Sequence, residues 1–112
     1  MARILVLGLI ACHSASPPDY PLHPTIRCTS GSHVSVLGAV QGPGAIACDT
    51  GMRLTAALVA AGGFTPRARR NQLRLFRGHG VYRVRYVLIL DGAAPDLELG
   101  PDDEIVVNET EL

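Results

Sequence analysis

The cysteine and histidine side chains are the residues of this chain best suited to chemistry, and their positions give little support for catalysis. A thiol nucleophile needs a neighbouring base and a third group that orients that base. Cys28 or Cys48 with His33 can supply the first two groups, and no third residue is apparent. The sequence also contains no GxSxG motif, no HExxH motif and no phosphate-binding loop of the P-loop type. We therefore predict a protein that is not an enzyme and that holds no metal ion or cofactor.

The start of the chain has the pattern of a bacterial export signal that ends at a cysteine. The apolar run at residues 4–11 is too short for a membrane-spanning helix, which needs about twenty residues, and it has the length of a signal-peptide core. The sequence Leu-Ile-Ala directly before Cys12 resembles the bacterial lipobox, in which the cysteine is lipidated and the peptide is cleaved before it. We therefore predict a signal peptide over residues 1–11 and a lipid anchor on Cys12. The alternative is an ordinary strand that ends in a buried thiol.

A proline-rich segment follows the predicted anchor. Residues 13–24 hold four prolines, which is typical of a tether and unfavourable for a sheet. We assign residues 12–32 to the lipidated cysteine and this flexible tether. In an exported protein Cys28 and Cys48 can form a disulfide, which would close a loop of about twenty residues and stabilise the domain by roughly 3 kcal/mol.

Hydrophobic periodicity predicts a series of short elements after the tether. Apolar residues at helical spacing from Leu54 to Ala61 predict one helix, with Asp49 or Thr50 as its N-terminal cap and a stop at the following Gly-Gly pair. Residues 87–90 fit either a turn of helix or an extension of the preceding strand. The predicted strands lie at residues 34–40, at residues 45–48, around Leu73 and Leu75, at residues 81–86 and at residues 104–107.

The length and the element order define the fold class. A chain of 112 residues with 47% hydrophobic content is sufficient for one domain with a modest core. The order strand, strand, helix, strand, strand, strand is compatible with a β-grasp, in which a small mixed sheet holds one helix on its apolar face. Other α+β folds share this order. We predict an α+β domain with about five short strands and one packed helix.

Three segments of the chain resemble the SLBB family, the soluble-ligand-binding β-grasp domains of bacterial polysaccharide-export lipoproteins. They are residues 36–44, residues 51–68 with the helix end Ala-Gly-Gly-Phe-Thr, and residues 99–107. The resemblance spans residues 33–108 and leaves residues 109–112 as a tail. It implies a β-grasp fold and an envelope lipoprotein that takes part in the export of capsular or extracellular polysaccharide.

The same resemblance implies the partners and the location of the chain. The expected partners are polysaccharide or proteins of an export complex, and the membrane through the lipid anchor. The outer membrane, with the domain in the periplasm, is the expected site. The family's export proteins carry a separate export domain, for which this chain has no room, so we expect an accessory relative or an oligomeric subunit of a larger assembly. The alternative is a general envelope module that contacts other proteins and binds no sugar.

The charges are unevenly distributed along a chain whose net charge is zero. This balance gives no reason to expect nucleic-acid binding. Seven of the ten arginines lie within residues 67–85, and eight of the ten acids lie from Asp91 onward. Arg67, Arg69 and Arg70 form a cluster after the helix, and guanidinium groups suit the carboxylates of acidic sugars or of a protein partner. The alternative is a solvated loop, or one that neutralises the acidic C-terminal part.

Overall fold

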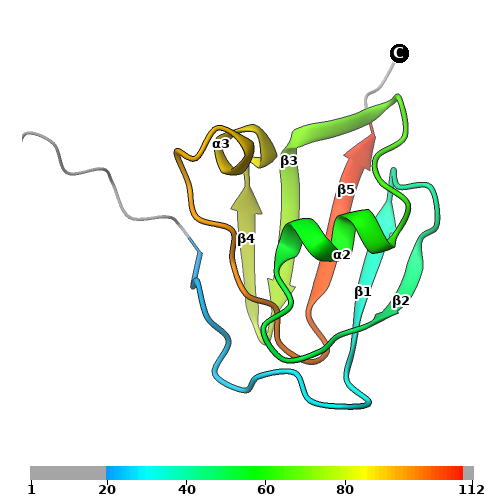
Figure 1. The fold of residues 1–112 in the computed structure, drawn as a ribbon. Coiled ribbons are helices and arrows are strands. Elements are labelled where there is room, and N and C mark those ends of the chain that lie inside the picture. Colours follow the sequence, from blue (N-terminus) through cyan, green and yellow to red (C-terminus); the bar gives the residue numbers. More distant parts are fainter. Residues whose placement is uncertain (1–19, 110–112) are drawn as a thin grey trace, which may run out of the picture.

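The structure is a computed structural model that describes residues 20–109. It consists of a five-stranded sheet with the order β2-β1-β5-β3-β4, and α2 lies across one face of this sheet (Figure 1). A second, short helix, α3, follows β4. The elements are β1 (His33–Gly38), β2 (Gly44–Ala47), α2 (Leu54–Ala60), β3 (Ala68–Arg77), β4 (Gly80–Val84), α3 (Tyr86–Leu90) and β5 (Glu104–Glu109).

The sheet is mixed because its first and last strands lie side by side in parallel. β1 pairs in parallel with β5, while β1 with β2, β3 with β5, and β3 with β4 are antiparallel pairs. Gly38 allows the close approach of β1 to β5. Its φ is +92°, and an added Cβ would lie 2.1 Å from the carbonyl oxygen of Val107. The predicted α+β fold with a mixed sheet of five strands and a packed helix is confirmed.

Alternation along the strands separates a buried face from an open one. Leu73 and Leu75 are completely buried on the same side as Leu54 and Leu58 of α2. Each fully buried side chain of this size contributes about 1.5–3 kcal/mol relative to an exposed one. Further buried side chains come from the parallel strands β1 and β5, namely Val34, Val36, Ile105 and Val107.

The start of α2 is capped by a residue that is distant in sequence. The prediction that Asp49 or Thr50 caps the helix is wrong, because α2 begins at Leu54 and the Thr50 hydroxyl donates to the carbonyl oxygen of Cys28 at 2.6 Å. The carboxylate of Asp96 instead accepts the backbone N–H of Thr55 at 3.2 Å and also contacts the Thr55 hydroxyl. A loop that follows α3 therefore satisfies the orphan donors at the start of α2.

The structure also shows where α2 ends and which conformation residues 87–90 adopt. Gly62 and Gly63 follow α2 with φ values of +90° and +85°, and the Gly63 N–H donates to the carbonyl oxygen of Leu58 at 3.0 Å, so the predicted glycine stop is confirmed. Residues 87–90 belong to the short helix α3 and do not extend the strand.

Within residues 20–109, no helix is both long and apolar enough to span a membrane.

The segment at residues 20–32 differs from the predicted tether. Tyr20 is only 8% exposed, its hydroxyl donates to the carbonyl oxygen of Pro95 at 3.2 Å, and Leu22 packs against the core. The carbonyl oxygen of Leu22 also accepts the N–H of Glu98 at 2.8 Å. The prolines exclude regular pairing in this segment, but its apolar side chains still bury themselves against the domain. The predicted signal peptide, Cys12 and the first part of the tether lie outside the described residues.

Candidate functional site

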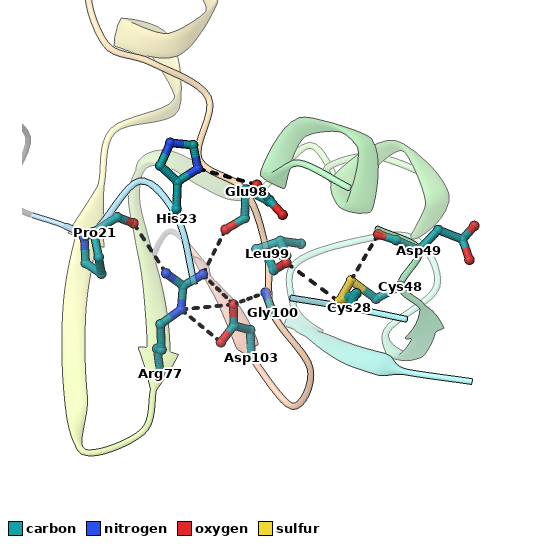
Figure 2. A network of polar contacts seen from close by, with 10 residues as sticks. All are labelled: Pro21, His23, Cys28, Cys48, Asp49, Arg77, Glu98, Leu99, Gly100 and Asp103. Atoms are coloured by element: carbon teal, nitrogen blue, oxygen red, sulfur yellow. Dashed lines mark hydrogen bonds and ion pairs between the residues drawn. A yellow bond between two sulfur atoms is a disulfide. The ribbon is translucent and has the colours of Figure 1, made fainter. Parts of the chain in front are cut away.

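The strongest polar cluster of the described chain joins β3, the turn before β5 and the N-terminal segment (Figure 2). Arg77 donates from Nε to both carboxylate oxygens of Asp103 at 3.1 Å, and one of its terminal nitrogens lies 2.6 Å from Asp103 Oδ2. It also donates to the carbonyl oxygens of Glu98 at 2.9 Å and of Pro21 at 3.3 Å. The side chains of Arg77 and Asp103 are only 15% and 4% exposed. This cluster is a structural clamp, because its donors and acceptors are occupied by the chain itself.

Glu98 is a second buried acid on this side of the molecule. Its side chain is 2% exposed, and its Oε1 accepts from Arg27 at 2.9 Å and lies 3.4 Å from His23 Nδ1. Among residues 20–109, its Oε2 has no hydrogen-bond partner. Burial alone would raise the pKa of Glu98, but the hydrogen bonds and positive charge from Arg27 and His23 outweigh burial and hold this pKa below its ordinary value of 4.5. The carboxylate therefore stays ionised and fastens residues 23–27 to the domain.

Cys28 and Cys48 form a disulfide, with their Cα atoms 5.7 Å apart. Both residues are buried, and Cys48 directly follows β2. The bond ties the N-terminal segment to the sheet edge at β2, while Arg77 and Glu98 hold the same segment at residues 21–27. These two thiols are consequently not free to act as the nucleophile considered above. In the part of the chain that the structure describes, no group of three His, Cys, Asp or Glu residues is placed to hold a metal ion.

Arg69 and Arg70, two members of the predicted cluster of Arg67, Arg69 and Arg70, have different contacts. Arg67 is exposed in the turn before β3. Arg69 donates to the side-chain oxygen of Gln72 at 3.1 Å, whereas the Arg70 guanidinium lies 5.2 Å from the ring centroid of Phe64. Neighbours along β3 point to opposite sides of the strand, so the two guanidinium groups are directed apart.

The open face of the sheet carries a different set of arginines. We use this name for the side chains of β1, β3, β4 and β5 that alternate with the buried ones, and none of them is buried. Arg69, Gln72, Arg74, Asn108 and Glu109 line a shallow polar depression. The open face consists of Ser35, Leu37, Gln72, Arg74, Phe76, Val81, Arg83, Glu104, Val106 and Asn108.

Sequence reasoning missed the most distinctive pair on this face. Arg74 on β3 lies directly opposite Arg83 on β4. The signal was present, since Arg74 alternates with Leu73 and Leu75, and Arg83 follows the short turn at Gly78 and His79. The short turn of this hairpin fixes which residues of its two strands lie opposite each other, and that register pairs Arg74 with Arg83. Sequence proximity instead drew attention to residues 67–70.

Comparison with known proteins identifies the domain. Residues 33–85 match the family model of the SLBB domain, a range that begins with β1 and ends directly after β4. No curated protein matches the chain. The matched segment contains both strands of the first hairpin, α2 with its glycine stop, and the β3–β4 hairpin, and β5 completes the sheet between β1 and β3. Residues 33–85 of this chain therefore belong to the SLBB domain family.

Proposed function

We propose that this chain is an envelope lipoprotein whose SLBB domain serves the export of capsular or extracellular polysaccharide. The match of residues 33–85 carries the proposal, because SLBB domains are associated with the binding of soluble ligands and often occur in polysaccharide-export proteins. The role is one of binding and assembly and involves no catalysis. Turnover of any saccharide by the purified chain would overturn this part of the proposal.

Two further features support a location outside the cytoplasm. A disulfide between Cys28 and Cys48 is suited to an oxidising compartment such as the periplasm. The lipobox-like sequence before Cys12 supplies the means of attachment. Tyr20, the first residue that the structure describes, is packed against the domain. Eight residue steps separate it from Cys12, and eight extended residues span at most about 28 Å. We therefore expect the domain to be held close to the membrane surface.

The attachment is tested by metabolic labelling with a palmitate analogue. Wild type is compared with Cys12→Ser, and the Cys28→Ser/Cys48→Ser double variant serves as a control that removes cysteines without removing the anchor. We expect label on the wild type and on the control and none on Cys12→Ser. Equal labelling of wild type and Cys12→Ser, or no label on either, contradicts the lipoprotein assignment.

The export role is tested in the host bacterium by deleting the gene and measuring surface-bound and secreted polysaccharide. We expect the deletion to reduce both fractions, the wild-type gene to restore them, and Cys12→Ser to restore them poorly. Unchanged polysaccharide in the deletion strain, with other envelope proteins still co-purifying with the chain, would contradict the export role. That result would identify a module for protein contacts alone.

A further inference from the structure

Two arginines face each other on the open face without an acid between them. Arg74 and Arg83 are direct partners in the antiparallel β3–β4 ladder, and both are exposed. Directly opposite side chains in such a ladder have Cβ atoms about 5 Å apart, and like charges at this position destabilise the pair. Within residues 20–109, neither guanidinium group forms a hydrogen bond or an ion pair. The fold thus holds two cations together at a cost to its own stability, which an anionic ligand would relieve.

The acids nearest to this pair do not neutralise it. Glu104 lies on the same face, but its partner across the β3–β5 ladder is Phe76. Glu109 lines the same depression as Arg74, but the two form no ion pair among the described residues. Arg77 on the same strand, by contrast, is fully engaged with Asp103 on the buried side. Arg77 is therefore not available to a ligand, whereas Arg74 and Arg83 are paired with no acid among residues 20–109.

The surroundings of the pair indicate the chemistry of the ligand. Phe76 is the next residue of β3 on this face, and its β4 partner Val81 is 57% exposed. The amides of Gln72 and Asn108 line the polar depression next to Arg74. An apolar ring can pack against the C–H face of a sugar, amides can bond its hydroxyl groups, and guanidinium groups grip carboxylates through paired hydrogen bonds.

The position on the sheet distinguishes a saccharide from an extended peptide. Both arginines project from the face of the sheet. β3 is paired on both of its sides, whereas β4 is an edge strand, so a peptide added there would lie next to Arg83 and one strand further from Arg74. A peptide strand usually binds a sheet by adding to an edge, where free backbone groups are available. A saccharide has no such requirement and can lie across side chains. We propose that the open face, centred on Arg74 and Arg83, binds a polysaccharide that carries carboxylate groups; this inference rests on the proposed function for the class of ligand.

The first test measures binding of the full-length chain to oligogalacturonate, a polymer of acidic sugars, by isothermal titration calorimetry. Dextran is the neutral saccharide and poly-glutamate the acidic peptide for comparison. We expect binding to oligogalacturonate alone, with affinity weakened at least about tenfold by Arg74→Gln and by Arg83→Gln. Arg53→Gln is the matched control, because it removes one exposed arginine from the α2 side, and it should leave affinity unchanged.

Arg83→Glu separates lost binding from lost folding. The new carboxylate would stand opposite Arg74 and pair with it, so the midpoint of thermal unfolding should rise by about 2–4 °C while oligogalacturonate binding disappears. The inference is overturned if wild type does not bind oligogalacturonate, or if Arg53→Gln weakens binding as much as Arg83→Gln. It is also overturned if poly-glutamate binds through these arginines and oligogalacturonate does not, which would indicate an acidic protein partner.

The same variants keep this inference separate from the proposed function. If export requires the chain but the Arg74→Gln/Arg83→Gln double variant restores export fully, the inference about the open face is wrong and the proposed function stands. If the purified chain binds oligogalacturonate through these arginines but its deletion leaves export unchanged, the proposed function is wrong and the binding face stands.

Discussion

Arg77 and Arg74 lie three residues apart on β3, on opposite faces of the sheet, and they differ in what surrounds their guanidinium groups. Arg77 is 15% exposed and donates to Asp103 and to two backbone carbonyl groups. Arg74 is exposed and has no partner among residues 20–109, apart from the unfavourable neighbour Arg83. The chemical group is the same in both cases, and its surroundings decide whether it serves the fold or remains available for a ligand.

The two faces of the sheet differ in the same way as these two arginines. On the α2 side, Glu98 and Asp103 are buried and each has an arginine partner. On the open face, the charges are solvated and unmatched. Substitutions on the first face should therefore change stability, whereas substitutions on the second should change binding and leave stability nearly constant or higher.

The largest stability effect is expected from Arg77→Met. The substitution leaves the Asp103 carboxylate buried without its arginine, and breaking a buried ion pair from one side costs about 3–5 kcal/mol. Urea unfolding followed by circular dichroism measures the change. The matched control is Arg74→Met on the same strand, which should stay within about 0.5 kcal/mol of wild type. Equal losses in the two variants would remove the distinction between the two faces.

The next effect concerns the disulfide that fastens the N-terminal segment. Replacing Cys28 and Cys48 by serine opens a loop with a sequence separation of 20, and we expect the free energy of unfolding to fall by about 3 kcal/mol. Dithiothreitol should cause a similar loss in wild type and no further loss in the double variant. A wild type that is insensitive to the reductant would show that the bond contributes nothing to stability.

A smaller loss is expected from Asp96→Ala. Asp96 accepts the backbone N–H of Thr55 in the first turn of α2, and removing such a cap costs about 1 kcal/mol. Asp49→Ala is the control, because Asp49 precedes the helix and makes no such bond. If Asp49→Ala proved the more damaging variant, the assignment of the cap from the sequence would be restored and the one from the structure rejected.

These three substitutions also mark the limit of what the sequence predicts. Alternation around Leu73 and Leu75 predicts a strand and the two faces on which its side chains lie, because period two is a local property. The Arg77–Asp103 pair and the Asp96 cap join residues that are 26 and 41 positions apart. Periodicity contains no information about such contacts, since they depend on how the loop before β5 folds back across the domain.

The N-terminal segment shows a different kind of limit. Its prolines correctly predict that the segment forms no strand. The tether prediction also assumed that none of its side chains pack against the domain. Tyr20 and Leu22 were the available signal, because apolar side chains in a proline-rich segment can bury themselves without regular backbone pairing. The arginine pair of the open face was accessible from the sequence, since the β3–β4 hairpin fixes its register locally.

A gain of stability is expected from Arg83→Glu. Replacing the like-charged pair by an opposite-charged pair should raise the free energy of unfolding by about 0.5 kcal/mol, because both side chains are exposed and water screens their interaction. The gain should disappear in an Arg74→Gln background, which a double-mutant cycle measures. A gain that persists without Arg74 would assign the effect to general charge balance and weaken the argument from the arginine pair.

The last prediction concerns Glu98. Its carboxylate is buried like that of Asp103, but its partners Arg27 and His23 are 60% and 66% exposed. The Glu98 pair is therefore intermediate between the buried Arg77–Asp103 pair and the exposed charges of the open face. Its pKa is below the ordinary value of 4.5, so its ionised form stabilises the fold above that pH, and this contribution is lost as the pH falls through the lowered folded-state pKa. Glu98→Gln cannot titrate, and the difference in unfolding free energy between it and wild type should shrink as the pH is lowered from neutral to about 3. His23→Gln should reduce the pH dependence of wild type only in part, because Arg27 remains. If the unfolding free energies of wild type and Glu98→Gln change in parallel with pH, the charge of Glu98 contributes nothing to stability. The contrast between paired and unpaired charges would then depend on the Arg77–Asp103 pair alone.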